Sequence, residues 1–364
     1  MIRKSVTLSL QEKIDKVRAK RGYGLSLSTP TFVPKVIKSI SLKKFNIQGN
    51  LSGEKKLISL AKKHLFYHWK VKKNNQIDLL ITSGAKAGLY CIFKVIADKF
   101  KQKNFGIVNP NWPTYIDLIK ISGAKSFFFN TILKNNYAIN LDSITKFIKI
   151  KKLRILIISS PNNPSGKIYE KKVIEELINI CEKNKCYLII DESFSSHIFT
   201  EKIKETYITY QSKYLILVNS FSKNFHLQGL RLGAILASKK LIEEFTNVHI
   251  AINGAPNYLA QNLIINNSKS LLKTEDIKKK MNFVSKFLSS KGVEYYKPDG
   301  SFYLFPKILN TKKFHTLSNK KGLFYLNGKY FGSKIYNSHY RFCFEKKKTE
   351  LEKIINLMNK YSIY

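Results

Sequence analysis

Residues 218–236 bring together side chains that could bind an aldehyde and a phosphate. The segment reads V-N-S-F-S-K-N-F-H-L-Q-G-L-R-L-G-A-I-L, so an apolar run ends in two serines and a lysine, and an arginine follows. The amine of Lys223 can form an imine with an aldehyde. Ser220, Ser222 and Arg231 can bind a phosphate, because hydroxyls donate hydrogen bonds to it and a guanidinium contacts two oxygens at once. Taken alone, a lysine in so lysine-rich a chain is more often a solvated surface group.

Three more polar segments stand next to apolar runs. Asp191 closes the run before it, where it could hold a cationic nitrogen, although a lone aspartate there is more often a turn or helix cap. The stretch 160–166, S-P-N-N-P-S-G, forms a turn in any protein and places Asn163 after another apolar run. Gly84, Ala85 and Lys86 begin a helical pattern, and a helix N-terminus binds phosphate through its free N–H groups; a simple helix start explains them equally well.

The order of these segments resembles the fold-type I aminotransferases of classes I and II. That family carries S-[FY]-[SA]-K followed by G-x-R-x-G, and this chain has the same string, with Gly229 and Gly233 as the glycines. The resemblance runs from about residue 25 to residue 345. It implies the cofactor pyridoxal 5'-phosphate, held by Lys223 as an imine, and the exchange of an amino group between an amino acid and a 2-oxo acid.

The resemblance also implies a role for each matching residue. Asp191 would pair with the pyridine nitrogen of the cofactor and keep it protonated, so that the ring can accept electrons. Asn163 would donate to the phenolate oxygen of the ring and lie beside the substrate. The backbone of Gly84, Ala85 and Lys86 would bind the phosphate, together with Ser220, Ser222 and Arg231. Trp112, in N-P-N-W-P-T-Y, would stack on the ring, although a tryptophan between two prolines could instead pack a loop.

Two further positions concern the substrate. Arg341 lies where the family keeps an arginine for the α-carboxylate, a role that needs the planar fork of a guanidinium; a surface arginine is the alternative. Ser28 falls in L-S-L-S-T-P, which resembles the substrate-contacting L-x-x-G-x-P segment with serine in place of glycine. Residues 247–253 contain no arginine, which argues against a specialist for dicarboxylates. In the expected reaction, the freed amine of Lys223 removes the Cα proton of the substrate.

Phe194 departs from the pattern. Most aminotransferases of the family place a tyrosine there, and its hydroxyl also binds the phenolate oxygen of the cofactor. Some relatives, including proteins similar to threonine-phosphate decarboxylase, carry phenylalanine there; the chain also resembles the branch of the histidinol-phosphate aminotransferases. A decarboxylase, lyase or cyclase on the same fold is therefore the alternative function, because residues that hold the cofactor do not choose the reaction.

The charge of the chain suggests another class of function, which we disfavour. The 364 residues carry 64 Lys and Arg against 24 Asp and Glu, a formal net charge of +40, and such a charge attracts nucleic acid and anionic membranes. Only six of the basic residues are arginine, and the lysines are spread over the whole chain, as in AT-rich genomes. Only about 45 residues precede the predicted cofactor domain, without a helix-turn-helix pattern. We expect neither a nucleic-acid nor a membrane partner.

The elements that must position these residues alternate along the chain. Short apolar runs bounded by turns predict strands, and helical patterns lie between them; the runs are 78–82, 105–108, 126–129, 153–159, 186–190, 214–218 and 233–237. This alternation predicts an α/β fold with a mostly parallel sheet covered by helices, and active groups at the strand ends. We place the large cofactor domain at 46–283 and a smaller α+β domain at 1–45 and 284–364. The second contains strands at 301–305, 323–326 and 340–344 and a final helix at 345–360, and its N-terminal part shows no sheet-like run.

The remaining features point to an ordinary intracellular enzyme. Cys91, Cys181, Cys186 and Cys343 lack C-x-x-C spacing, which indicates buried thiols rather than disulfides or a metal site. His64 and His68 have metal-ligand spacing without a completing carboxylate, so we interpret them as helix-surface residues. The N-terminus lacks a signal-peptide pattern, and a cytoplasmic location is expected. By resemblance, the protein is expected to be a homodimer.

Overall fold

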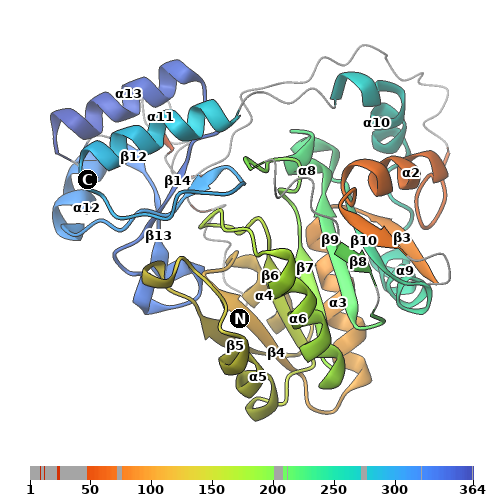
Figure 1. Ribbon diagram of the computed structural model, residues 1–364. Helices are drawn as coiled ribbons and strands as arrows, with labels where there is room; N and C mark the ends of the chain where they lie inside the picture. The colour runs from red at the N-terminus through yellow and green to blue at the C-terminus, as the bar shows by residue number, and fades with distance from the viewer. Residues whose placement is uncertain are drawn as a thin grey trace.

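The computed structural model describes residues 47–71, 76–200, 208–210, 212–271, 277–320, 322–362 and 364, together with positions 9, 12, 23 and 24. Its centre is a seven-stranded sheet in the order β3-β10-β9-β7-β6-β4-β5 (Figure 1). All neighbours pair in parallel except β10, which is antiparallel to both β3 and β9. The strands are β3 (Ile77–Thr82), β4 (Asn104–Asn109), β5 (Lys125–Asn130), β6 (Ile155–Ser159), β7 (Tyr187–Asp191), β9 (Leu215–Ser220) and β10 (Gly233–Ser238). The predicted mostly parallel sheet is confirmed.

Helices cover both faces of this sheet, which is why its central strands are apolar on both sides. In β7, Ile189 packs into the core on one face and Ile190 into the core on the other. The first face is covered by α3 (Ala85–Lys99), α4 (Thr114–Ile121) and α9 (Lys239–Asn253). The second is covered by α2 (Lys55–His64), α5 (Leu141–Ile150), α6 (Lys171–Lys183) and α10 (Tyr258–Leu271).

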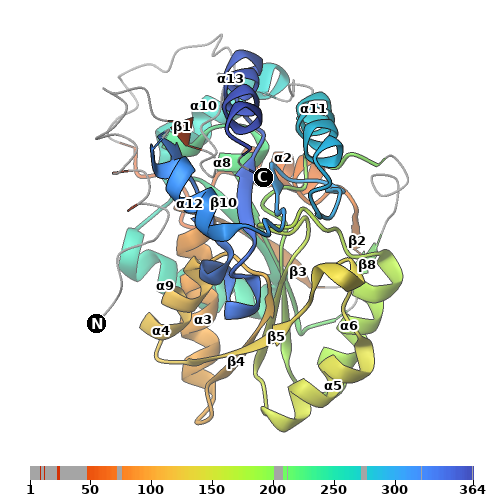
Figure 2. The same cartoon turned by 90° about the vertical axis from the view of Figure 1, so that its left-hand side faces the viewer.

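A separate core lies above the sheet, where α11, α12 and α13 gather in both views (Figures 1 and 2). Its elements are α11 (Ile277–Ser290), α12 (Thr311–Lys320), α13 (Lys348–Lys360), β11 (Tyr303–Leu304), β12 (Leu323–Phe324) and β14 (Tyr340–Cys343), and β13 (Leu326–Asn327) pairs with β14. The proposed boundary at residue 283 falls inside α11, whose Ile277, Met281 and Val284 all pack in this core. Helix α13 begins at Lys348, later than predicted, because Glu345 and Lys346 are buried in the turn after β14.

Short strands were the main elements that the pattern did not reveal. Residues Tyr23–Gly24 form β1, which pairs in parallel with β12, so the expectation that the N-terminal part lacks a strand was wrong. Strand β2 (Trp69–Val71) pairs with β8 (Ile208–Tyr210) in a second two-stranded sheet. Runs of two or three residues are too short to show alternation. The short helices are α8 (Phe221–Asn224), η2 (Leu133–Asn135), η3 (Gln228–Leu230), η4 (Gly328–Phe331) and η5 (Lys334–Tyr336).

The register of the sheet aligns the ends of strands that carry the predicted motifs. Gly233 at the start of β10 pairs with Thr82 on one side and with Ser220 on the other. Asp191 at the end of β7 pairs with Ser159 and with Val218. The segments that follow Thr82, Ser159, Asp191 and Ser220 therefore emerge at one edge of the sheet, as expected for the carboxyl ends of parallel strands.

Two global expectations can be compared with the fold. All four cysteines are buried, as predicted, and each is a free thiol. Within the described residues, no helix is both long and apolar enough to cross a bilayer.

Candidate active site

Gly233 and Gly84 allow the two predicted phosphate-binding segments to touch. A Cβ on Gly233 would lie 2.3 Å from the backbone nitrogen of Ala85, and a Cβ on Gly84 would lie 2.8 Å from a terminal nitrogen of Arg231. Gly84 also has φ +92°, a conformation that side chains rarely adopt. The two glycines therefore bring the start of α3 and the Arg231 guanidinium together, at a place that we name the phosphate cradle.

The start of α3 is open toward the phosphate cradle. Gly84 precedes the helix, and no side chain caps the first turn. Backbone N–H groups in a first turn have no partner within the helix, and they attract anions. The loop is held from behind, because the backbone N–H of Ser83 donates to Nε2 of buried His249 over 2.9 Å. Burial lowers the pKa of His249, which keeps it the neutral acceptor that this bond needs.

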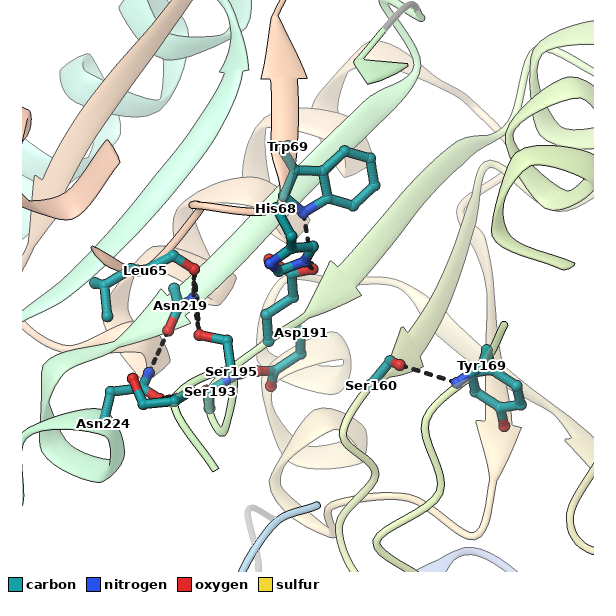
Figure 3. A network of polar contacts seen from close by, with 12 residues as sticks. Leu65, His68, Trp69, Ser160, Tyr169, Asp191, Ser193, Ser195, Asn219 and Asn224 are labelled. Atoms are coloured by element: carbon teal, nitrogen blue, oxygen red, sulfur yellow. Dashed lines mark hydrogen bonds and ion pairs between the residues drawn. The ribbon is translucent and has the colours of Figure 1, made fainter. Parts of the chain in front are cut away.

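Two buried asparagines hold the turn that carries Lys223. Asn219 donates through Nδ2 to the carbonyl of Leu65 at 2.8 Å and to Oγ of Ser195 at 3.0 Å. Asn224 donates to Oδ1 of Asn219 and to the carbonyl of Ser220. Figure 3 shows these contacts joining the ends of β7 and β9. The lysine thus stands on a rigid support, and the sequence reasoning did not single out either asparagine.

Lys223 lies in α8, between Ser222 and Asn224, and Ser220 caps that turn by accepting from the backbone N–H of Ser222 at 3.2 Å. Burial lowers the pKa of Lys223; the charge of Glu345 raises it, and those of Arg341 and Arg231 lower it. A lowered pKa makes the neutral amine, the nucleophilic form, easier to reach.

Asp191 is buried at the end of β7 and accepts three hydrogen bonds (Figure 3 shows it beside Ser193). Its Oδ2 accepts from the hydroxyl of Tyr115 at 2.6 Å, and its Oδ1 accepts from the hydroxyl and the backbone N–H of Ser193 at 2.6 and 3.0 Å. Burial raises the pKa of Asp191, and these hydrogen bonds oppose the rise. Burial and the charge of Asp191 hold the pKa of Tyr115 well above its usual value, so it remains a donor. The role of Tyr115 was not foreseen.

Trp112 lies between the phosphate cradle and Tyr115, the residue that donates to Asp191. Its ring meets Tyr115 edge to face, with centroids 5.5 Å apart, and the ammonium of Lys86 lies 5.6 Å from its centroid. The ring is only partly buried, so part of its surface remains accessible. The geometry is compatible with the predicted stacking role, which stays a prediction.

Arg341 and Asn163 meet although 178 residues separate them. The guanidinium of Arg341 donates through Nη1 to Oδ1 of Asn163 at 3.0 Å, and both side chains are buried. Its central carbon lies 4.3 Å from the ring centroid of Tyr303 and 5.3 Å from that of Phe331. The two aromatic rings and the amide orient the guanidinium, so a surface location for Arg341 was the wrong alternative.

Two predicted site positions have different outcomes. Phe194 is buried, and its ring packs edge to face on Phe302 and Tyr303, with centroids 5.2 and 5.7 Å apart. It therefore contributes to the core of the smaller domain, a packing role that tyrosine could fill only by also satisfying its hydroxyl. Ser28 lies outside the described residues.

His68 differs from its predicted position on a helix surface. It follows the end of α2, and its Nε2 lies 2.8 Å from Oε1 of buried Glu192, which also accepts from Nε1 of Trp69 at 2.9 Å (Figure 3). The i, i+4 spacing predicted one helix that carries both histidines, but α2 ends at His64. Among the residues that the structure describes, no group of three or more His, Cys, Asp or Glu side chains is arranged to hold a metal.

These residues fit pyridoxal phosphate. The uncapped start of α3 and the Arg231 guanidinium suit the phosphate, the buried carboxylate of Asp191 suits a protonated pyridine nitrogen, and Lys223 supplies an amine for the aldehyde. Lysine, carboxylate and phosphate cradle stand at one edge of one sheet, at the ends of β9, β7 and β3.

Comparison with known proteins leads to the same family. Residues 24–357 match the family "Aminotransferase class I and II". An aspartate aminotransferase of Thermotoga maritima is 26% identical over 236 residues, which are 64% of this chain and 61% of that protein. An aspartate aminotransferase of Sulfurisphaera tokodaii is 26% identical over 301 residues, which are 78% of this chain and 75% of that protein.

Solved structures agree with the fold over nearly the whole chain. The crystal structure of a Thermotoga maritima aspartate aminotransferase superposes with a TM-score of 0.85 at 22% identity, covering 100% of this chain and 98% of that one. A putative kynurenine aminotransferase from Saccharomyces cerevisiae gives 0.82 at 20% identity, with coverage of 99% and 96%. This chain belongs to the class I and II aminotransferases, pyridoxal-phosphate-dependent enzymes of fold type I that exchange an amino group between an amino acid and a 2-oxo acid.

Proposed function

We propose that this protein is itself an aminotransferase whose catalytic groups are Lys223 and Asp191. The observation that carries the proposal is the meeting of a half-buried lysine, a buried carboxylate and an open helix start at one sheet edge. When bound, the cofactor supplies an aldehyde for the amine and a ring that stores the electrons released at the substrate Cα. Lys223 is the proton carrier at that carbon, because burial lowers its pKa and so favours the neutral amine that can accept a proton.

The remaining residues bind and orient. Arg231, Ser220, Ser222 and the backbone of residues 84–86 hold the phosphate, and Trp112 covers one face of the ring. Arg341 takes the α-carboxylate of the substrate, and its bond to Asn163 links the substrate-binding and cofactor-binding parts of the site. Two aromatic rings fix its guanidinium, so the fork is already oriented before the substrate arrives.

The substrate that we propose to test first is aspartate, because the curated relatives described above are aspartate aminotransferases by name. The absence of arginine from residues 247–253 argues for a wider panel, with neutral and aromatic amino acids beside the dicarboxylates. All of these amino acids carry the α-carboxylate that Arg341 is proposed to bind.

We also propose a homodimer and a cytoplasmic location. Arg231 and Lys86 are exposed in the single chain, although both belong to the phosphate-binding segments. The apolar residues Leu51 and Ile252 are 46% and 54% exposed. Both lie on segments that adjoin the phosphate cradle. The carbonyl of Ser52 accepts from the backbone N–H of Ile81 near the end of β3, and Ile252 follows His249 on α9. A second chain on this face would cover them. The four free cysteines agree with a reducing compartment.

Borohydride reduction followed by peptide mass spectrometry tests the proposal directly. The purified protein is expected to bind pyridoxal phosphate with visible absorbance, and reduction should leave the cofactor mass on the peptide that contains Lys223. Incubation with the amino-acid panel should then yield a 2-oxo acid. Release of carbon dioxide instead would favour the decarboxylase alternative that Phe194 raised, and an unmodified Lys223 would refute the assignment of the site.

A further inference from the structure

A buried histidine and a buried glutamate form a close pair next to the lysine turn. Nδ1 of His226 lies 2.8 Å from Oε1 of Glu345, and the two side chains are 3% and 1% exposed. His226 comes three residues after Lys223, whereas Glu345 follows β14 of the smaller domain. Burying two such groups is costly unless each partner compensates the other. We call it the His226–Glu345 pair.

The surroundings of the pair connect it to Lys223 through the backbone. Nε2 of His197 lies 3.0 Å from the carbonyl oxygen of Lys223, and because a carbonyl only accepts, this nitrogen carries the proton. The His197 and His226 rings are 5.4 Å apart, and both pack on Phe302, at 4.5 and 5.7 Å. Burial and the nearby His226 lower the pKa of His197 to about 4, so His197 is neutral at neutral pH.

The charges around the lysine nitrogen are unequal in sign. The groups whose charges act on it are Arg231 after η3, Arg341 and Cys343 on β14, and Glu345 after that strand; His226 contacts Glu345, and His197 contacts the backbone carbonyl of Lys223. The two arginines oppose a positive lysine, and Glu345 is the leading group that favours one. Lys346, next to Glu345, is directed to another partner, since its ammonium lies 3.3 Å from Glu350.

We propose that the His226–Glu345 pair acts on amino transfer through Lys223: the Glu345 carboxylate favours a positive charge on the lysine nitrogen, and His226 limits that effect by drawing on the same carboxylate. The pair is a positioning and electrostatic device, and neither residue touches the reacting atoms in this role. It also ties the lysine turn of the large domain to the strand that carries Arg341. The inference rests on the proposed role of Lys223.

The two members of the pair should act in opposite directions when they are changed one at a time. Glu345→Gln removes the negative charge and leaves the arginines unopposed, so the lysine nitrogen loses its proton at lower pH. His226→Gln removes the group that shares the carboxylate, so the full charge of Glu345 acts on Lys223, and the nitrogen keeps its proton to higher pH. A purely structural role would move both variants the same way, because either change loosens the same contact.

The experiment is a pH titration of the visible absorbance of the cofactor-bound protein, which reports the proton on the nitrogen of Lys223. The midpoint is expected to fall by about one pH unit in Glu345→Gln and to rise by about half a unit or more in His226→Gln, the size of a single nearby charge effect. His68→Gln is the matched control, because it breaks another histidine–glutamate contact of 2.8 Å, and its glutamate is not one of the groups whose charges act on Lys223. Its midpoint should equal that of the wild type.

Each outcome decides. Shifts in the same direction, or shifts no larger than that of His68→Gln, overturn the inference while leaving the proposed function intact. A wild type whose absorbance does not arise from a bond to Lys223 overturns both. If Glu345→Gln does not fold, as judged by urea unfolding, Glu345→Asp keeps the charge but withdraws it from the lysine, and a smaller downward shift is then expected; an upward shift or none overturns the inference.

Discussion

At the scale of single residues, the site depends on how burial changes the ionisation of two groups. Burial lowers the pKa of Lys223 and raises that of Asp191, which moves both toward the neutral forms that a solvated pair would not adopt. A cofactor that carries an aldehyde and a protonated ring nitrogen would relieve both costs, because it would take up the amine of Lys223 and pair with the carboxylate of Asp191. The same burial would therefore favour its binding.

Replacing the catalytic lysine should stabilise the cofactor-free protein. The folded-state pKa of Lys223 lies below the unfolded value near 10.5, so the unfolded chain binds more protons and wild-type stability rises with pH in the window below 10.5. Lys223→Met lacks this term and should be more stable at pH 7 by on the order of 1 kcal/mol, a gain that shrinks toward pH 10. Urea unfolding of cofactor-free protein at both pH values measures it. The same variant should lose amino transfer by at least about 10³-fold. A variant less stable than the wild type at pH 7 would contradict this assignment.

Removing the hydroxyl of Tyr115 should shift the pH profile of the enzyme. Tyr115→Phe deletes a 2.6 Å bond to Asp191 that opposes the rise in the pKa of this carboxyl, so the pKa should increase. Because the ionised carboxylate is the competent form, the acidic limb of kcat against pH moves to higher pH, and kcat falls by about tenfold.

The control for that change is Tyr137→Phe. The hydroxyl of Tyr137 is also buried and has no hydrogen-bond partner among the described residues, so its loss should leave the acidic limb in place. A limb that moves equally in both variants would mean that Tyr115 acts only through packing.

At the scale of elements, the antiparallel strand β10 decides whether the phosphate cradle exists. It lies between β3 and β9 and so brings the ends of these two strands together, although they are about 140 residues apart in the chain. Helix α3 follows the end of β3, and α8 follows the end of β9. Only glycine fits at its first position, because a Cβ there would overlap the backbone of Ala85.

Gly233→Ala should therefore weaken cofactor binding and stability together. The overlap with Ala85 must push the start of α3 away from Arg231, so we expect a loss of about 1–3 kcal/mol in the free energy of unfolding and at least a tenfold rise in the Kd for pyridoxal phosphate. Fluorescence titration and urea unfolding measure the two effects. Gly229→Ala is the control in the same motif, because nothing lies within 4 Å of its Cβ position; an equal loss there would show that the close approach is not the cause.

At the scale of the whole molecule, the net charge of each chain should oppose formation of the proposed homodimer. Each chain carries a formal charge of +40, and two such chains repel, whereas the exposed Leu51 and Ile252 favour association. Salt screens the repulsion and leaves the apolar contact, so it should tighten the proposed dimer.

Sedimentation velocity at low and high salt tests this balance. The dimer should dissociate more readily at about 0.05 M than at about 0.5 M sodium chloride, and Ile252→Lys should shift the population toward monomer at both. Ile150→Lys is the control, since Ile150 is 72% exposed at the end of α5, which covers the sheet far along its order from β3. A dimer that weakens with salt would instead be held by charge pairs.

The sequence by itself determined the groups that act locally. The lysine after two serines, the aspartate at a strand end and the glycine-rich helix start each follow an apolar run, and the periodicity of such runs predicts where strands end. That information is sufficient for a mostly parallel sheet, and the resemblance of these motifs to the aminotransferases implies the cofactor. It did not show β1, β2 or β8, which are too short to carry a period.

Only the tertiary structure decided which distant groups meet. Arg341 on Asn163, Tyr115 on Asp191 and His226 on Glu345 are contacts across 178, 76 and 119 residues, and no periodicity specifies them. They depend on sheet register and on the docking of the smaller domain, which are set by the packing of whole faces. For that reason the cofactor could be inferred from motifs that resemble a family, whereas the charged groups near Lys223 became visible only in three dimensions.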